Sequence, residues 1–159
     1  MAANQIYNIA LGRGAEWVNR VNSNDPTNSV IVWDLLATSG LESDATLKDK
    51  DDFSALVSGA TNFATGTGWA RKTLDQTGGL VVTVDDTNDR TDIDMPDLTW
   101  TAVANAADDV SALVSGYDSD STAGTDANII PWTQHDFLIQ PDGSDVTAQI
   151  AAAGFFRAS

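Results

Sequence analysis

The stretch SVIVWDLLAT, residues 29–38, constrains the fold more than any other part of the chain. It is a continuous apolar run that is rich in β-branched and aromatic residues. Such a run is typical of a strand buried on both faces, because a strand with one face in water alternates between apolar and polar residues. We therefore predict that these residues form the central strand of a sheet.

Two nearly identical nonapeptides lie farther along the chain, DDFSALVSG at residues 51–59 and DDVSALVSG at residues 108–116. A true repeat would indicate a solenoid or a two-lobed binding module. The flanks do not match, however, since ATNFATGTG follows the first copy and YDSDSTAGT follows the second. An internal duplication is therefore poorly supported, and each copy has to be interpreted in its own context.

The two copies are predicted to fold differently. In the first, Asp51 or Asp52 can cap a helix whose apolar face begins at Phe53. The second lies among predicted strands, and its side chains fall on two alternating faces as in a strand, although its residues fit a helix nearly as well. We predict a helix at residues 52–58 and a strand at residues 110–117, with tertiary context deciding each.

The remaining pattern is a chain of short strands after one N-terminal helix. Residues 4–21 place apolar side chains near a helical stripe, with Gly12 and Gly14 as soft spots where the helix bends or begins late. Alternating or apolar segments then predict strands in WARKTL (69–74), GGLVVTVDD (78–86), RTDIDMPDLTWTAV (90–103), ANIIPWTQHDFLIQ (127–140) and DVTAQI (145–150). The second and third of these are predicted to pair as a hairpin, and the last two to form a final hairpin around the PDGS turn.

These elements predict one α+β domain over residues 1–159 that is mainly β. Its architecture is expected to be an antiparallel β-sandwich or a barrel-like sheet, with the N-terminal helix and one short second helix. Residues 1–22 form the N-terminal helical segment, and residues 151–159 form a C-terminal tail. Phe155 and Phe156 in this tail are expected to pack on the core or on a neighbouring subunit.

Charge and composition exclude several classes of function. The net charge of −15 opposes binding to nucleic acid and to anionic membranes, because both require clustered Lys and Arg. The chain has no cysteine for disulfides or thiolate metal sites. It also lacks an apolar run long enough to span a membrane and the pattern of a signal peptide, so we expect synthesis in the cytoplasm.

Neither metal binding nor catalysis is favoured by the motifs. Asp118 and Asp120 have the first spacing of an EF-hand loop, but Ala123 stands at the required glycine and Ile129 at the bidentate glutamate. A solvated turn is the preferred interpretation, an incidental cation between subunits is the alternative, and no cofactor is expected.

Catalysis would depend on a single histidine. His135 has Asp136 beside it, but the sequence contains no nucleophile elbow, no H-E-x-x-H and no phosphate loop. We predict that the protein is not an enzyme and that His135 is a structural hydrogen-bonding residue.

Tryptophans on the predicted strands offer a separate possibility, stacking on sugars. We expect at least three of them to be core residues instead. They are Trp33, Trp69, Trp100 and Trp132.

Several phrases resemble a group of tailed-bacteriophage virion structural proteins. They are IYNIALGRGAEWVNRVNSNDPTNS, WARKTL, DDTNDRTDIDMPDLTWTA, IIPWTQHDFLIQPDGSDVTA and AAGFFRAS, which together cover most of the chain in order. The resemblance implies a head decoration (cement) protein that binds the major capsid protein on the outer surface of the virion. It carries over no catalytic residue, because none of these phrases is a catalytic motif.

This role implies a trimer or another small symmetric oligomer. The alternatives are a tail, collar or fibre component and a carbohydrate-binding module for host attachment. For contact with the capsid or a neighbouring subunit, we select apolar residues near both ends of the chain together with one arginine. They are Ile6, Tyr7, Ile9, Trp17, Phe155, Phe156 and Arg157.

Overall fold

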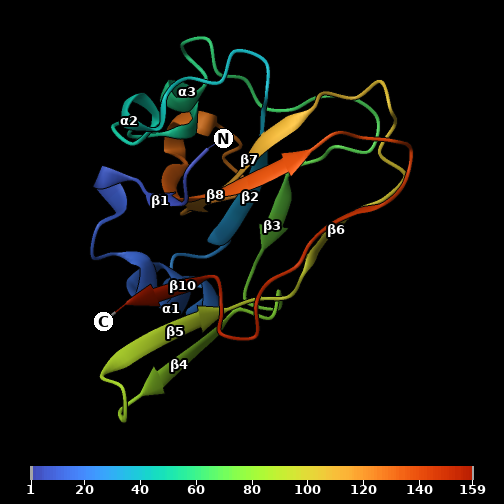
Figure 1. Ribbon diagram of the computed structural model, residues 1–159. Helices are drawn as coiled ribbons and strands as arrows, with labels where there is room; N and C mark the ends of the chain where they lie inside the picture. The colour runs from blue at the N-terminus through green and yellow to red at the C-terminus, as the bar shows by residue number, and fades with distance from the viewer. Residues whose placement is uncertain (1, 159) are drawn as a thin grey trace.

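The computed structural model describes residues 2–158, which fold around one cluster of buried apolar side chains. These residues form ten strands in three antiparallel sheets, with three α-helices beside them (Figure 1). The strands are β1 (Gln5–Ile6), β2 (Val30–Ala37), β3 (Lys72–Leu74), β4 (Val81–Asp85), β5 (Arg90–Asp94), β6 (Leu98–Trp100), β7 (Val110–Asp118), β8 (Ile130–Ile139), β9 (Val146–Ala148) and β10 (Phe156–Ala158). The helices are α1 (Gly14–Ser23), α2 (Asp44–Leu47) and α3 (Phe53–Leu56), with 3-10 turns η1 (Asn8–Ala10) and η2 (Asp126–Asn128).

The predicted strand at residues 29–38 is β2, and all of its residues are buried. The main sheet has the order β1-β8-β7-β2-β3, so β2 is an interior strand while β7 occupies the middle. β7 is also buried along its whole length. The continuous apolar run therefore does mark a strand covered on both faces, as its composition predicts.

The two copies of the repeated stretch adopt different structures, as predicted. The first forms α3, where the Asp52 side chain accepts a 2.7 Å hydrogen bond from the amide of Ala55 and so caps the helix. The second forms β7, between β8 and β2. The sequence did not indicate α2, a single turn that Ser43 caps and that buries Leu47.

The N-terminal helix begins late. Only residues 14–23 are α-helical, and Gln5 and Ile6 pair with β8 instead of joining the helix. Gly12 has a φ of +77°, a left-handed conformation that breaks a helix and that glycine adopts without strain. The predicted helical segment at residues 1–22 is therefore wrong over its first half, and Met1 lies outside the described residues.

One predicted hairpin is confirmed and the other is wrong. β4 and β5 pair over five residues, from Val81 opposite Asp94 to Asp85 opposite Arg90. β8, in contrast, pairs with β7 and β1, whereas β9 pairs with β6.

The turn predicted between β8 and β9 does form, with the Asp142 carboxylate accepting the amide of Ser144 at 3.0 Å. It is bound to another part of the chain, because Gly143 donates to the Val103 carbonyl and Val103 donates to the Ser144 carbonyl. These bonds direct β9 to β6 and away from β8.

The predicted class, α+β and mainly β with antiparallel sheets, is confirmed. The main sheet is open, with β1 and β3 at its edges, so it is not a closed barrel. The other strands form separate sheets of three and two strands, and this pairing does not establish a sandwich. Within residues 2–158 no helix is both long enough and apolar enough to cross a membrane.

Candidate contact site at the chain ends

The two ends of the chain, selected separately from the sequence, lie together in the structure. Ile6, Phe155, Phe156 and Arg157 line one shallow groove of about 260 Å³. The rest of the lining consists of Asn4, Gln5, Thr133, Gln134 and His135. Four of the seven selected residues thus belong to one site, although about 150 positions separate them in the sequence.

β1 supplies the N-terminal wall of this groove. Gln5 and Ile6 lie opposite Gln134 and Thr133 of β8, and the side-chain oxygen of Asn4 accepts the Asp136 amide at 2.8 Å. Ile6 is half-buried against the core, so part of its side chain faces the groove. The wall is held by backbone pairing and does not depend on the groove being filled.

Tyr7 is a core residue and not a surface contact. Its side chain is fully buried, and its hydroxyl donates to the amide oxygen of Gln134 at 3.1 Å. Gln134 donates in turn to Asp44 at 2.9 Å. Burial, and to a lesser degree the Asp44 carboxylate, raises the pKa of Tyr7, so the donating hydroxyl stays protonated. This side chain fixes β1 to β8 and α2.

Trp17 is likewise buried, and Ile9 lies apart from the groove. The Trp17 indole stacks on Tyr117 with ring centroids 5.4 Å apart and meets Trp132 edge-on at 6.0 Å. Ile9 lies in η1, half-buried against the core. Within α1 the predicted helical stripe is the buried side of the helix, formed by Trp17, Val18 and Val21.

The C-terminal segment forms the opposite wall and is not a free tail. Phe156, Arg157 and Ala158 pair as β10 with the outer edge of β5. Just before them, Gly154 adopts a φ of +84°, and a side chain there would collide with the Ile93 carbonyl. The predicted tail at residues 151–159 is therefore docked on the fold, with residues 156–158 forming a strand, while Ser159 lies outside the described residues.

The two phenylalanines pack on aromatic residues of the main sheet, as predicted. The Phe155 ring lies 5.1 Å from Trp33 and 5.2 Å from Trp132, centroid to centroid, and the Phe156 ring lies 5.1 Å from Trp132. Both phenylalanines remain partly exposed. The C-terminal segment thus covers the core and presents an apolar surface to the groove.

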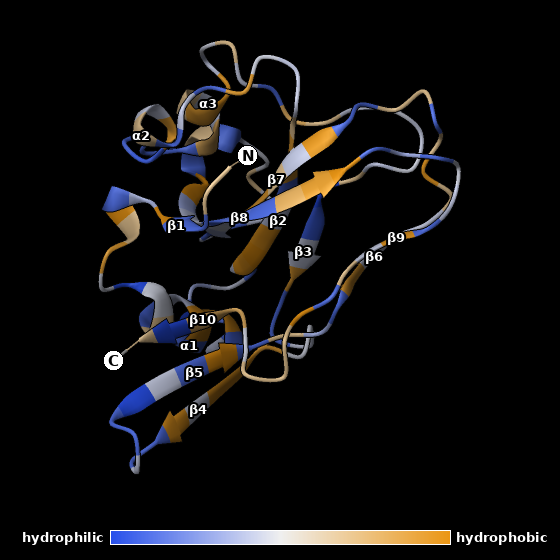
Figure 2. Cartoon of the chain, in the orientation of Figure 1, coloured by the Kyte–Doolittle hydropathy of each residue, from blue (hydrophilic) through white to orange (hydrophobic). Residues whose placement is uncertain are grey.

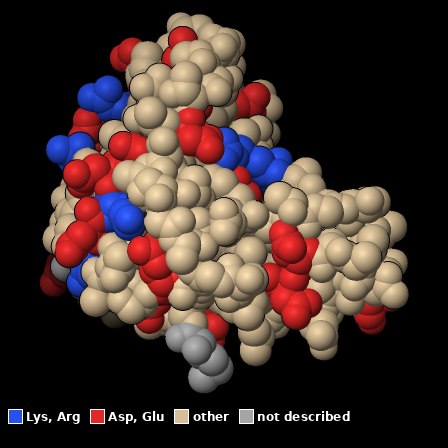
Figure 3. Space-filling model, turned by 90° about the horizontal axis from the view of Figure 1, so that it is seen from above, with Lys and Arg blue, Asp and Glu red and all other residues tan. Residues whose placement is uncertain are grey.

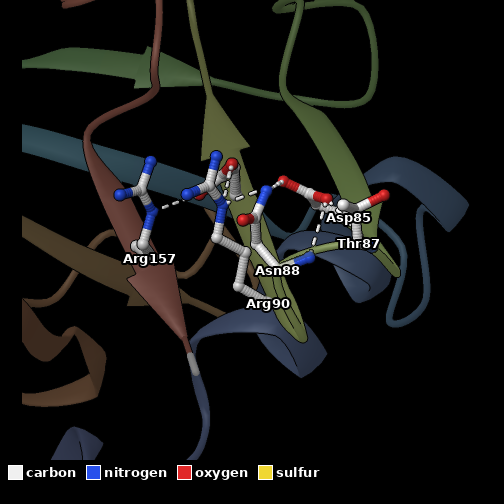
Figure 4. A network of polar contacts seen from close by, with 6 residues as sticks. Asp85, Thr87, Asn88, Arg90 and Arg157 are labelled. Carbon is white, nitrogen blue, oxygen red and sulfur yellow. Dashed lines mark hydrogen bonds and ion pairs between the residues drawn. The ribbon is translucent and has the colours of Figure 1, made fainter.

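Arg157 is fixed by a network of charges on the β4–β5 hairpin (Figure 4). Its Nε atom lies 2.6 Å from Asp92, and Arg90 lies 3.1 Å from the other oxygen of the same carboxylate. Arg90 also contacts Asp85 at 3.2 Å, and Asn88 donates to that residue at 2.7 Å. The hydrogen bond from Arg157 lowers the pKa of Asp92, which keeps the carboxylate ionised.

A second pocket of about 270 Å³ adjoins the groove on the other side of Phe155 and His135. Its walls include Trp33, Phe137 and Ile150. The His135 ring is hydrogen-bonded through Nε2 to the Thr133 hydroxyl at 2.9 Å, and burial lowers its pKa, so the imidazole is neutral at pH 7. His135 thus lies on a strand and makes a side-chain hydrogen bond within it.

Two buried N–H donors border these hollows. The side-chain nitrogens of Gln5, in the groove, and of Trp33, in the adjoining pocket, find no acceptor among residues 2–158. Each unpaired donor costs free energy, but both nitrogens are shielded from the hollows, so a bound group reaches them only if the side chains move. The argument for a binding surface therefore depends on the apolar side chains that line the groove, Ile6, Phe155 and Phe156.

The tryptophans and acidic turns are accounted for within the fold. All five tryptophans lie in the described residues, and all are buried. In the acidic turn after β7, Asp118 accepts the Asp120 amide at 3.0 Å, and Asp120 accepts the Thr122 hydroxyl at 2.6 Å. Across residues 2–158 no group of three or more His, Asp or Glu side chains is close enough to hold a metal ion.

Sequence reasoning missed the residues that hold the site together. Neither Asp92 nor Gln134 was among the residues selected for contact. Their roles depend on the pairing of β10 with β5 and of β1 with β8, for which no local motif exists. Comparison with known proteins adds no assignment, since no family model, curated protein or solved structure matches the chain.

Proposed function

We propose that the protein is a structural component of a tailed-bacteriophage particle, which decorates and stabilises the head by binding the major capsid protein from outside. The observation that carries the proposal is the meeting of Ile6 with Phe155, Phe156 and Arg157 in one groove. This arrangement brings four of the seven residues selected for contact into one site. The assignment to a phage particle rests on the sequence segments that resemble tailed-bacteriophage virion structural proteins.

The chemistry of the groove suits a protein partner. Its apolar rings can cover a partner's side chain, and Arg157 keeps nearly half of its side chain exposed at the rim. Backbone pairing of β1 and β10 holds both walls in place before binding, which reduces the entropy lost on association. A small groove of this kind is sufficient on a repeating lattice, where each molecule is held at several points.

The surface charge is consistent with a position on the outer surface of a capsid. In the view of Figure 3 acidic side chains are spread over the whole face, and the fewer basic ones lie among them. A net charge of −15 repels nucleic acid released from lysed cells and limits adhesion between particles. The same charge requires that the specific contact be made by apolar and hydrogen-bonding groups.

The burial of every tryptophan counts against the carbohydrate-binding alternative, because no indole ring is free to stack on a sugar. A glycan array probed with the isolated protein would test that alternative directly. The tail, collar and fibre alternatives differ from the proposal only in location.

Co-sedimentation with capsids assembled without this protein tests the proposal. We expect saturable binding to expanded capsids, at least tenfold weaker binding of Ile6→Glu, and unchanged binding of Leu11→Glu, which alters an exposed leucine outside the groove. No binding by the folded wild-type protein would overturn the proposal, as would cryo-EM density for it on the tail alone.

A further inference from the structure

We infer that the open edge of β4 is a self-association surface, which pairs antiparallel with β4 of a second copy of this chain. The three-stranded sheet has the order β10-β5-β4, so β4 pairs with β5 on one side only. No other described strand pairs with its outer edge. Such an edge presents unpaired backbone N–H and C=O groups that can bind another strand.

This edge lacks the features with which proteins usually protect an open strand. Residues 80–84 have the sequence LVVTV, which contains no charged residue and no proline. β4 pairs with β5 along its whole length without a bulge. The amide of Asn22 donates to the Leu80 carbonyl at 3.3 Å, just before the strand begins. The open part of the edge therefore runs from Val81 to Asp85, a length typical of a strand in a sheet.

Exposed apolar side chains are concentrated on the same strand. The structure has four exposed large apolar residues among those described, and two of them, Val81 and Val84, belong to β4 with exposed fractions of 50% and 69%. Figure 2 shows the end of β4 as hydrophobic beside a largely hydrophilic β5. A strand added to this edge would cover both valines.

Ion pairs on the hairpin reduce the electrostatic repulsion between two copies. Two molecules of net charge −15 repel each other, but on the hairpin Asp85 and Asp92 form ion pairs with Arg90 of the same hairpin and with Arg157 of β10. The strand itself is neutral up to Asp85. Asp86, Asp89 and Asp94 of the hairpin are in no ion pair among the described residues, so some repulsion remains and added salt should strengthen the contact by screening it.

β4 is also complementary to itself. A two-fold axis through Thr83 sets Thr83 opposite its own copy, Val82 opposite the partner's Val84, and Val81 opposite the partner's Asp85. The Val82–Val84 pairs extend the apolar face that Ile93 begins, and no two carboxylates face each other. Edge pairing of this kind is two-fold, so it produces a dimer and not a trimer.

Sedimentation of the isolated full-length protein over a range of concentrations tests the inference without any capsid. We expect a reversible dimer, tightened by salt, with Val84→Lys weakening association at least tenfold. The matched control is Leu138→Lys, which alters a leucine that is 64% exposed on β8. A wild-type monomer at every concentration, or equal weakening by the control, would overturn the inference.

Cross-linking provides a second test, because the chain has no cysteine of its own. In the proposed register the two Cβ atoms at position 83 lie about 5 Å apart, close to the reach of a disulfide. We expect Thr83→Cys to form a covalent dimer under mild oxidation much faster than Leu138→Cys. Equal rates for the two variants would contradict the pairing, whether or not the protein binds capsids.

Discussion

Nε of Arg71 donates a 2.8 Å hydrogen bond to Oδ2 of Asp34, the one charged residue in the otherwise apolar strand β2. Arg71 also reaches Asp126 of η2 at 2.6 Å, and its guanidinium lies over the Phe53 ring of α3 at 5.6 Å. A single side chain thus connects the main sheet to α3 and η2. The Asp34 side chain is only 11% exposed, so its charge depends on this partner.

Replacing Arg71 with methionine keeps most of the apolar stem but leaves Asp34 buried without a counterion. We expect Arg71→Met to lower the free energy of unfolding at pH 7 by about 3 kcal/mol, measured by urea denaturation. The control is Arg20→Met, which removes an exposed pair with Glu16 and should change stability far less, because solvent screens an exposed ion pair. Equal effects of the two substitutions would contradict the role assigned to Arg71.

The deficit of Arg71→Met should also depend on pH. Burial raises the pKa of Asp34 in the folded protein, and the Arg71 hydrogen bond opposes that rise. A raised folded-state pKa means that the contribution of Asp34 to stability is present below its unfolded pKa, about 3.9, and is lost as pH increases through the folded value. Without Arg71 the folded pKa rises further, so we expect a larger deficit relative to wild type at pH 7 than at pH 4.5. An equal deficit at both values would show that the substitution acts through packing alone.

A second prediction concerns helix capping and compares equivalent aspartates in the two copies of the repeated stretch. Asp52 caps α3, whereas its counterpart Asp109 lies just before β7 and offers only its backbone carbonyl, to Thr38. We expect Asp52→Ala to cost about 1 kcal/mol of unfolding free energy and Asp109→Ala to cost almost nothing. The two variants share sequence context and charge change, so calorimetry of the pair isolates the cap. A reversed order would contradict the capping assignment.

Local sequence signals were sufficient where they coincide with burial or turn chemistry. The continuous run in β2, the cap at Asp52 and the β4–β5 alternation each predicted an element that the structure contains. The predictions that were wrong concern pairing over long distances. Nothing near residues 5–6 indicates β8 as their partner, and nothing near residues 146–148 indicates β6.

The candidate site shows the same division between local and long-range information. Apolar residues near both chain ends pointed to contact segments, but composition could not distinguish the buried Tyr7 and Trp17 from the groove-lining Ile6 and Phe156. That distinction depends on which side of each element packs on the sheet.

A third prediction concerns the C-terminal segment as part of the core. Phe155 packs on both Trp33 and Trp132, so Phe155→Ala should cost about 2 kcal/mol and change the intrinsic fluorescence of the folded protein. Leu138→Ala removes an exposed side chain and should cost less than about 0.5 kcal/mol. A stable Phe155→Ala protein with unchanged fluorescence would mean that the segment is not docked as described.

The final prediction compares the two glycines that end the repeated stretches. A Cβ added at Gly116 would lie 2.7 Å from Cγ2 of Ile129 and 2.8 Å from Cε1 of Phe53, both in the packed core. A Cβ at Gly59 would lie 2.6 Å from a carboxylate oxygen of Glu42, at the end of a half-exposed side chain that can move away.

We therefore expect Gly116→Ala to cost about 1–3 kcal/mol and Gly59→Ala less than about 1 kcal/mol, measured by thermal unfolding. Neither glycine has a positive φ, so backbone strain does not enter the comparison. Equal costs would indicate that Phe53 and Ile129 can move aside as easily as Glu42. That result would contradict the close packing of α3 against β7. This packing is the tertiary context in which one copy of the stretch is a helix and the other is a strand.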